Sequence, residues 1–230
     1  MAGEDALFET GVTTGRALRN PFLAGLLRDT ELGMWSLSAS TLDFLQQQIQ
    51  RLKPQMVMEF GSGISTVCLA RYMQELHGDG DRVYVVSLDQ NAGFVQKTIE
   101  SLETLQLARH ARVFHAPLRR QMVEGVESAF YDVPAGLMDP VLQGVQADFV
   151  LVDGPAGDHP ARFGTLPLVR RWLSPRATFL LDDALRDGEL KVAQLWSSLP
   201  YVTVSGLHVN GKGLLIGRVA GIESDQPSAK

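Results

Sequence analysis

Short apolar runs alternate along this chain with segments in which apolar residues recur every three or four positions. The first pattern predicts strands buried on both faces, and the second predicts helices that cover them. We predict strands over residues 56–60, 83–88, 113–115, 149–152 and 178–181. We predict helices over residues 67–76, 91–102, 166–173 and 189–199. This alternation is typical of an α/β fold with a parallel sheet.

The last part of the chain departs from the alternation. Residues 201–209 and 212–219 are both β-type runs, and Asn210-Gly211 lies between them. Asn-Gly is the strongest short signal for a tight turn between antiparallel strands. The pattern therefore predicts that the parallel sheet ends in an antiparallel hairpin.

Two segments border this core. In the first, a short helix is predicted over residues 23–28, and Ser40 with Asp43 resembles a capping box that begins a helix ending before Pro54. In the second, residues 117–147, the pattern is irregular.

The chain divides into three parts by these patterns. We predict an N-terminal helical segment over residues 1–54 that serves as a substrate lid, a main domain over residues 55–220 and a disordered tail over residues 221–230. The tail is expected to be frayed because it is polar and terminal.

Length and composition fit one sizeable α/β domain. The chain has 230 residues, of which 45% are hydrophobic, and a net charge of −5. Nucleic acids and anionic membranes are bound by clustered basic side chains, which an acidic chain does not favour. We therefore expect neither of them as a partner.

The cysteine content and the N-terminal sequence bear on location. Cys68 is the single cysteine, so an internal disulfide is excluded. The first residues lack the basic and then apolar pattern of a secretory signal, and no apolar run approaches the ~20 residues that span a bilayer. We expect a cytoplasmic protein.

Polar residues gather where each predicted strand stops. In a parallel sheet of this kind, ligands bind beyond the carboxyl ends of the strands. The residues there are Glu59 to Gly63, Asp89-Gln90, His115 to Leu118, Asp153-Gly154-Pro155 and Asp182-Asp183. We therefore expect the ligand site at this edge.

The glycine-rich bend after the first strand narrows the choice of ligand. Gly61 and Gly63 would let the backbone come close to a ligand, and Asp89 could accept hydrogen bonds from both hydroxyls of a ribose. A dinucleotide fingerprint requires a third glycine where Thr66 stands, and a phosphate-binding loop requires a Gly-Lys-Ser/Thr that is absent. The combination indicates a ligand that contains adenosine.

The order of these motifs resembles class I S-adenosylmethionine-dependent methyltransferases. Residues 59–66, Glu-Phe-Gly-Ser-Gly-Ile-Ser-Thr, are similar to the first motif of that family, and Asp89 matches its ribose-binding acid. Gly-Ser-Gly-x-Ser-Thr, His-Ala-Pro-Leu and Val-Asp-Gly-Pro are most similar to a bacterial group of small-molecule methyltransferases, related at a distance to catechol-type O-methyltransferases.

The resemblance implies a fold, a cofactor and a substrate class. The implied fold is a Rossmann-like, doubly wound sheet of seven strands, mostly parallel with an antiparallel C-terminal hairpin. The implied reaction moves a methyl group from S-adenosyl-L-methionine to a hydroxyl of a small molecule. A homodimer is compatible with the sequence, and the methyl acceptor is not specified by it.

The resemblance also implies roles for individual residues. The methionine part of the cofactor would be held by Gly61, Ser62, Gly63 and Thr66, and the ribose by Asp89. Ala116, Leu118 and Gln90 would border the adenine, and Glu59 would orient the first loop. Other readings stay open: Ser65 or Thr66 as a helix N-cap, His115 as a structural histidine, and Asp89 as a turn residue.

Three acids raise the question of a metal. Asp153, Asp182 and Asp183 follow two strands that neighbour each other, and their like charges repel unless a cation lies between them. Oxygen ligands of this kind suit Mg²⁺ or another divalent cation. The resemblance implies that these three residues are metal ligands, although the lysine that catechol-type enzymes carry after the fourth strand is absent here. In the alternative reading, Asp183 caps a helix from residue 184 and Asp182 shapes the loop.

Two residues are predicted as candidate catalytic bases. Asp153 is one, and His159, in a polar loop after the fourth strand, is the other because an imidazole titrates near neutrality. Arg162 either anchors an anionic substrate or caps neighbouring structure. Trp35 and Tyr131 are aromatic residues that either contact the substrate or pack in the core.

Two rival functions remain at this point. A nicotinamide-dependent oxidoreductase is disfavoured because the chain has no Tyr-x-x-x-Lys pair. A regulatory domain that binds the cofactor without catalysis is disfavoured because it would not need the acids after the fourth and fifth strands.

Overall fold

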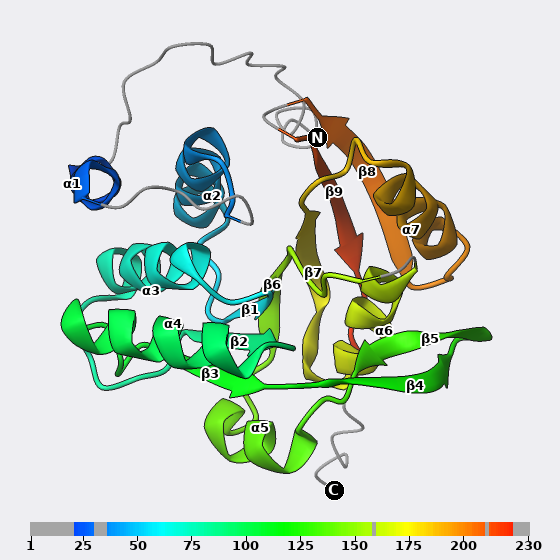
Figure 1. The fold of residues 1–230 in the computed structure, drawn as a ribbon, viewed down its shortest axis with the longest axis horizontal. Coiled ribbons are helices and arrows are strands. Elements are labelled where there is room, and N and C mark those ends of the chain that lie inside the picture. The colour runs from blue at the N-terminus through cyan, green and yellow to red at the C-terminus, as the bar shows by residue number, and fades with distance from the viewer. Residues whose placement is uncertain (1–20, 30–35, 158–159, 210–211, 223–230) are drawn as a thin grey trace, which may run out of the picture.

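A seven-stranded sheet forms the centre of the molecule, in the order β3-β2-β1-β6-β7-β9-β8 (Figure 1). The computed structural model describes residues 21–29, 36–157, 160–209 and 212–222. The strands are β1 Val57–Phe60, β2 Val85–Asp89, β3 Ala111–His115, β6 Ala147–Val152, β7 Leu173–Leu181, β8 Val202–His208 and β9 Leu214–Val219. The first five are parallel in sheet order from β3 to β7, and β9 runs antiparallel to both its neighbours. The predicted fold class is confirmed.

The two faces of the sheet carry separate apolar cores. Successive side chains of a strand point to opposite faces, so Val57 belongs to one core and Met58 and Phe60 to the other. The helices α1 Pro21–Asp29, α2 Ala39–Leu52, α3 Ile64–His77 and α4 Ala92–Thr104 cover the first face. The elements α5 Ala135–Leu142, α6 Thr165–Val169 and α7 Asp187–Ser197 cover the second. Helices on both faces leave the carboxyl edge of the sheet as the natural place for a site.

The N-terminal helices belong to this packing. The buried side of α2 carries Leu42, Leu45 and Ile49, which join the same core as α3. Its N-cap is Ser38, whose hydroxyl accepts a hydrogen bond from the amide of Thr41 at 3.1 Å. The helix is confirmed, but the predicted capping box at Ser40 is wrong, because the chain turns helical before Ser40 is reached.

The segment from residue 117 to residue 147 is regular where an irregular segment was predicted. It forms an antiparallel hairpin of β4 Leu118–Val123 and β5 Val126–Tyr131, followed by α5. The two turn residues, Glu124 and Gly125, have φ of 48° and 78°. Two positive φ values are typical of a two-residue turn that matches the twist of a hairpin.

Two other predicted boundaries shift. The helix predicted over residues 166–173 ends earlier, because α6 continues as a 3₁₀ turn over Arg170–Trp172 and Leu173 already begins β7. The C-terminal hairpin is confirmed by the pairing of β8 with β9, while its predicted turn at Asn210-Gly211 lies outside the described residues. Trp35 and the tail from residue 223 also lie outside them.

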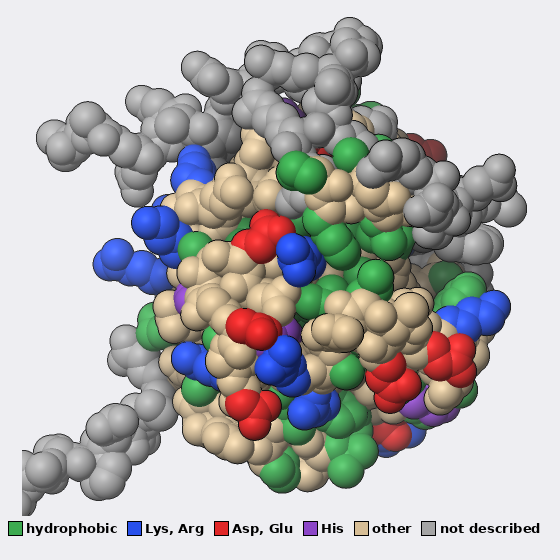
Figure 2. Space-filling model, turned by 90° about the vertical axis from the view of Figure 1, so that its left-hand side faces the viewer, with side chains coloured by type: hydrophobic (Ala, Val, Ile, Leu, Met, Phe, Trp, Pro, Cys, Tyr) green, Lys and Arg blue, Asp and Glu red, His purple; other side chains and the backbone are tan. Residues whose placement is uncertain are grey.

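The outer surface is of ordinary mixed character on the face seen in Figure 2. Acidic and basic side chains are interspersed there, with apolar side chains between them. Ion pairs between exposed side chains contribute little to stability, so we assign this face no structural role beyond contact with solvent. Among the helices that the structure describes, none has both the length and the apolar character needed to cross a membrane.

Candidate functional site

The predicted ligand-binding residues meet at the carboxyl edge of the sheet. Phe60, the last residue of β1, pairs with Leu88 in β2 and with Val152 in β6, and Val152 pairs with Leu181 in β7. The residues that directly follow these four positions therefore lie side by side. They are Gly61, Asp89, Asp153 and Asp182.

The two glycines of the first loop are needed for different reasons. Gly61 has a φ of +94°, and a Cβ there would lie 3.1 Å from the carbonyl carbon of Asp153 and 3.2 Å from the amide nitrogen of Gly154. Gly61 is thus required by close packing of β1 against the end of β6. Gly63 has a φ of +157°, which strains any side chain, but a Cβ there would meet no atom of the described residues within 4 Å. The open space of the loop therefore lies beside Gly63.

The amino end of α3 faces this open space. Its N-cap is Gly63, which has no side chain to accept hydrogen bonds from the first turn. The amide of Gly63 donates to the hydroxyl of Thr66 at 3.1 Å, and that hydroxyl donates to Glu59 Oε2 at 2.5 Å. The N-cap reading of Ser65 or Thr66 is therefore wrong, since both lie inside the helix. The remaining first-turn N–H groups can bind an anionic group.

Glu59 lies beneath the loop and is fully buried. Burial raises its pKa from 4.5 to about 7, and the charge of Asp89 adds to this, while the hydroxyls of Ser65, Thr66 and Ser87 offset it in part. Its second oxygen, Oε1, has no hydrogen-bond partner among the described residues. Glu59 therefore holds the loop through Thr66, and its side chain does not reach the surface.

Asp89 fastens the same loop from β2. Its Oδ2 accepts hydrogen bonds from the amide of Ser62 at 2.6 Å and from the Ser62 hydroxyl at 3.0 Å. Its Oδ1 accepts from the amide of Asn91 at 2.7 Å. A carboxylate has about four lone-pair sites. One site on Oδ1 thus stays free, and a second becomes available when the Ser62 hydroxyl turns away.

The residues predicted to border the adenine also lie together. The side-chain amide of Gln90 donates to the carbonyl of Ala156 at 2.9 Å, so it joins the end of β2 to the loop after β6. Leu118 lies 3.9 Å from where a Cβ of Gly157 would stand, and Ala116 is fully buried. His115 contacts the carbonyl of Gln90 through Nε2 at 3.1 Å, which agrees with its structural reading.

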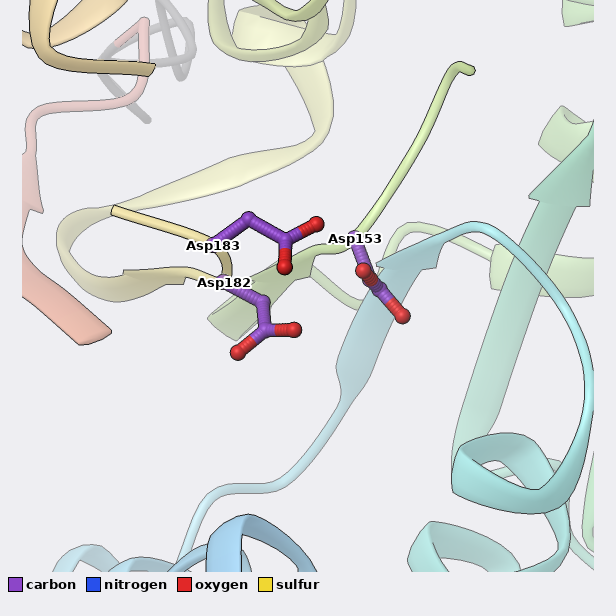
Figure 3. Close-up of side chains that lie close together, drawn as sticks. All are labelled: Asp153, Asp182 and Asp183. Carbon is purple, nitrogen blue, oxygen red and sulfur yellow. The ribbon is translucent and has the colours of Figure 1, made fainter. Parts of the chain in front are cut away.

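Asp153, Asp182 and Asp183 form an acidic cluster at the ends of β6 and β7 (Figure 3). One carboxylate oxygen from each lies within 4.8 Å of the others. Burial is the largest cause that raises the pKa of Asp153 and Asp182, the latter to about 6, and neighbouring carboxylates add to it. Of the three, Asp153 has the most exposed side chain, at 14%. Asp182 and Asp183 are both buried.

Arg162 is the residue that completes this cluster. It lies in a 3₁₀ turn over Ala161–Gly164 and is 7% exposed. Its Nη2 lies 3.3 Å from Asp183 Oδ2 and 3.7 Å from Asp153 Oδ1, and its Nε lies 3.6 Å from Glu189 Oε1. Its Nη1 and Nη2 also donate to the main-chain carbonyls of Asp182 and Asp153, each at 3.0 Å.

Asp183 has more cations around it than the sequence suggested. Its Oδ2 lies 2.8 Å from Arg186, and its Oδ1 lies 3.7 Å from Lys212. The prediction that Asp183 caps a helix from residue 184 is wrong, because α7 begins at Asp187 with Arg186 at its N-cap. Asp183 instead takes a φ of 59° in the turn that follows β7.

These contacts bear on whether the cluster suits a divalent metal. Carboxylate oxygens at this spacing are the donors that Mg²⁺ and Ca²⁺ prefer. A buried guanidinium, however, already lies against two of the three carboxylates, and two further cations lie against Asp183. The donor type suits a metal, but the charge of the cluster does not require one.

Two further predicted residues remain. His159 lies outside the described residues. Tyr131, at the end of β5, is 1% exposed, and a Cβ on Gly154 would lie 2.5 Å from its hydroxyl oxygen. Its ring packs 5.5 Å from that of Phe60. Tyr131 therefore belongs to the core and also reaches the edge of the sheet beside Asp153.

Together, the strand order, the bend at the end of β1, and the acids at the ends of β2 and β6 define a class I Rossmann-like methyltransferase. The chain belongs to a methyltransferase domain family, whose model matches residues 58–184. The prediction of an S-adenosylmethionine-dependent methyltransferase is thereby confirmed, and the oxidoreductase alternative is not supported.

Solved structures share the fold at low sequence identity. An O-methyltransferase from Bacillus cereus in complex with S-adenosylhomocysteine is 19% identical, with a TM-score of 0.58 and coverage of 86% of this chain and 89% of that one. TomG, an O-methyltransferase from Streptomyces achromogenes in complex with S-adenosylmethionine, is 19% identical, with a TM-score of 0.57 and coverage of 87% and 88%. A methyltransferase from Geobacter sulfurreducens is 17% identical, with a TM-score of 0.57 and coverage of 86% and 87%. No curated protein matches the chain.

Proposed function

We propose that this protein transfers a methyl group from S-adenosylmethionine to a hydroxyl group of a small molecule at the carboxyl edge of β1, β2 and β6. The observation that carries the proposal is the open space beside Gly63, at the amino end of α3 and next to Ser62, which Asp89 binds. Methyltransferases from B. cereus and S. achromogenes with the same fold have S-adenosylhomocysteine and S-adenosylmethionine bound.

The residues around this space suit the two ends of the cofactor. The first-turn N–H groups of α3 would hold the carboxylate of its methionine part, and Ser62 and Thr66 would fix the loop that presents them. Asp89 would accept a ribose hydroxyl at the free site on Oδ1, and a second one when the Ser62 hydroxyl rotates. Gln90, Ala116 and Leu118 would border the adenine.

We propose Asp153 as the base that takes the proton of the acceptor. S-adenosylmethionine supplies an activated methyl group on a sulfonium. As the acceptor oxygen bonds to that methyl carbon, the S–CH₃ bond would break to leave S-adenosylhomocysteine, and a carboxylate oxygen of Asp153 would take the hydroxyl proton. A pKa raised by burial makes the carboxylate a stronger base, and such a base contributes about 10²- to 10⁴-fold to a rate. His159 remains a second predicted base.

The acceptor is proposed at the level of its class. The hairpin β4–β5 and helices α1 and α2 lie outside the seven-stranded sheet, and we propose them as the substrate lid. A net charge of −5 supports a small molecule rather than a nucleic acid. The single, buried Cys68 agrees with a reducing compartment such as the cytoplasm.

Calorimetric titration with S-adenosylhomocysteine tests the cofactor site. The wild-type protein should bind it, and Asp89→Ala should weaken binding about 10- to 100-fold, because charge-assisted hydrogen bonds are lost. Asp153→Asn should bind normally and lose turnover in a methyl-transfer assay against a panel of small phenols and alcohols. Ser205→Ala, on the exposed part of β8, is the matched control. No heat with the wild-type protein, or unchanged affinity in Asp89→Ala, would refute the proposal.

A further inference from the structure

The acidic cluster already holds a cation of its own. All three nitrogens of the Arg162 guanidinium face acceptors, namely two main-chain carbonyls and the carboxylates of Asp153, Asp183 and Glu189. The two carbonyls that accept hydrogen bonds from the guanidinium belong to the residues that follow β6 and β7. These hydrogen bonds hold the guanidinium whether the carboxylates are protonated or ionised. A planar group with five donors is suited to this bridging role, and a mobile ammonium is not.

The position of Arg162 is one that a metal ion would have to share. A divalent ion bound by all three aspartates would lie close to the guanidinium, which is 3.3 Å from Asp183 and 3.7 Å from Asp153. Like charges at such distances repel strongly in a buried site. Arg186 and Lys212 on Asp183 add to the repulsion. Only Asp182 has no side-chain ion pair to a cation among the contacts of the described residues.

We propose that Arg162 is the resident cation of this cluster and takes the place of a divalent metal, so that methyl transfer needs no metal ion at Asp153, Asp182 and Asp183. Arg162 acts as a positioning residue, because it holds the carboxylate of Asp153 toward the site instead of contacting the acceptor itself. The inference rests on the proposed function and states which cation neutralises the carboxylates of its site.

Direct binding of Mn²⁺, followed by the loss of the free-ion electron paramagnetic resonance signal, tests the proposal. Wild-type protein should show no saturable binding up to about 1 mM, the weak end of the range for protein Ca²⁺ sites. Arg162→Met removes the charge at similar length, and it should gain a saturable site that Asp182→Asn then abolishes. Arg162→Lys keeps a positive charge and should gain no saturable Mn²⁺ site. Arg120→Met, whose side chain is 78% exposed, is the matched control.

The outcomes separate this inference from the proposed function. Saturable Mn²⁺ binding by the wild-type protein that Asp182→Asn removes would overturn it, even if Arg162→Met did not fold. A folded Arg162→Met protein that gains no site would overturn it as well. Turnover unchanged by a chelator would support it. S-adenosylhomocysteine binding is measured on the same samples. If the wild-type protein does not bind S-adenosylhomocysteine, the proposed function is contradicted, independently of the result with Mn²⁺.

Discussion

Replacing Glu59 by glutamine tests the physical account of the first loop most directly. Glu59 is fully buried, and its pKa is raised from 4.5 to about 7. A raised pKa means that the folded protein binds this proton more tightly than the unfolded chain does. The stability that Glu59 contributes is therefore present below pH 4.5 and is lost as the pH rises through about 7.

The size of the effect follows from the same shift. One pKa unit corresponds to about 1.4 kcal/mol, so the ionised carboxylate costs the folded state roughly 3 kcal/mol at alkaline pH. Glutamine resembles the neutral acid and does not titrate. The free energy of unfolding of Glu59→Gln, minus that of the wild type, should rise by about 2–3 kcal/mol between about pH 5 and about pH 8.

Urea unfolding at several pH values measures this difference. Contributions from other groups that titrate, such as Asp182, cancel when variant and wild type are compared at each pH. A constant offset from the glutamine amide also cancels, because only the change with pH is read. Glu103→Gln, on the exposed side of α4, is the control for the substitution itself. A flat difference for Glu59→Gln would show that burial does not set this pKa.

Three further substitutions probe the same edge. Gly61→Ala should lower the free energy of unfolding by at least about 2 kcal/mol in urea titrations, because it puts a Cβ on a positive φ and against the main chain of Asp153; a smaller loss would contradict the tight packing. Thr66→Val should cost about 1–3 kcal/mol by the same measurement, because it breaks both hydrogen bonds of the hydroxyl, and a neutral result would mean that the link to Glu59 is not formed. Tyr131→Phe removes a buried hydroxyl beside Asp153, so it should cost up to about 1.5 kcal/mol of unfolding free energy and lower kcat/KM; unchanged activity would assign Tyr131 to core packing alone.

The parallel core was predictable because its signal is local. Strands β1, β2, β6 and the second half of β7 are largely buried on both faces, so each reads as an apolar run, while the edge strand β3 is only partly buried; all five are present within about five residues of their expected bounds. The hairpin β4–β5 was missed because its first strand is mostly polar and exposed, with Arg119 and Arg120 pointing to solvent. Its turn at Glu124-Gly125 also lacks the Asn-Gly or Asp-Gly pair that marks such turns most strongly.

The role of Arg162 could not be found from local pattern. Its partners Asp183 and Glu189 lie more than 20 positions further along the chain, and only the pairing of β6 with β7 brings them to it. In the sequence, α6 and β7 lie between Arg162 and these two acids. Acids at the ends of two strands therefore suggested a metal, while folding brings Arg162 against them.

The contact between Gly61 and the end of β6 has a consequence for how natural variation in this chain should be interpreted. Selection at Gly61 acts on folding itself, so even a homologue that had abandoned catalysis would be expected to retain glycine there. Gly63 borders open space but has a φ of +157°, so a side chain there would be strained and would also project into the space proposed for the methionine part of the cofactor. Homologues that keep glycine at position 61 but carry another residue at position 63 would thus be expected to have lost or changed their enzymatic function.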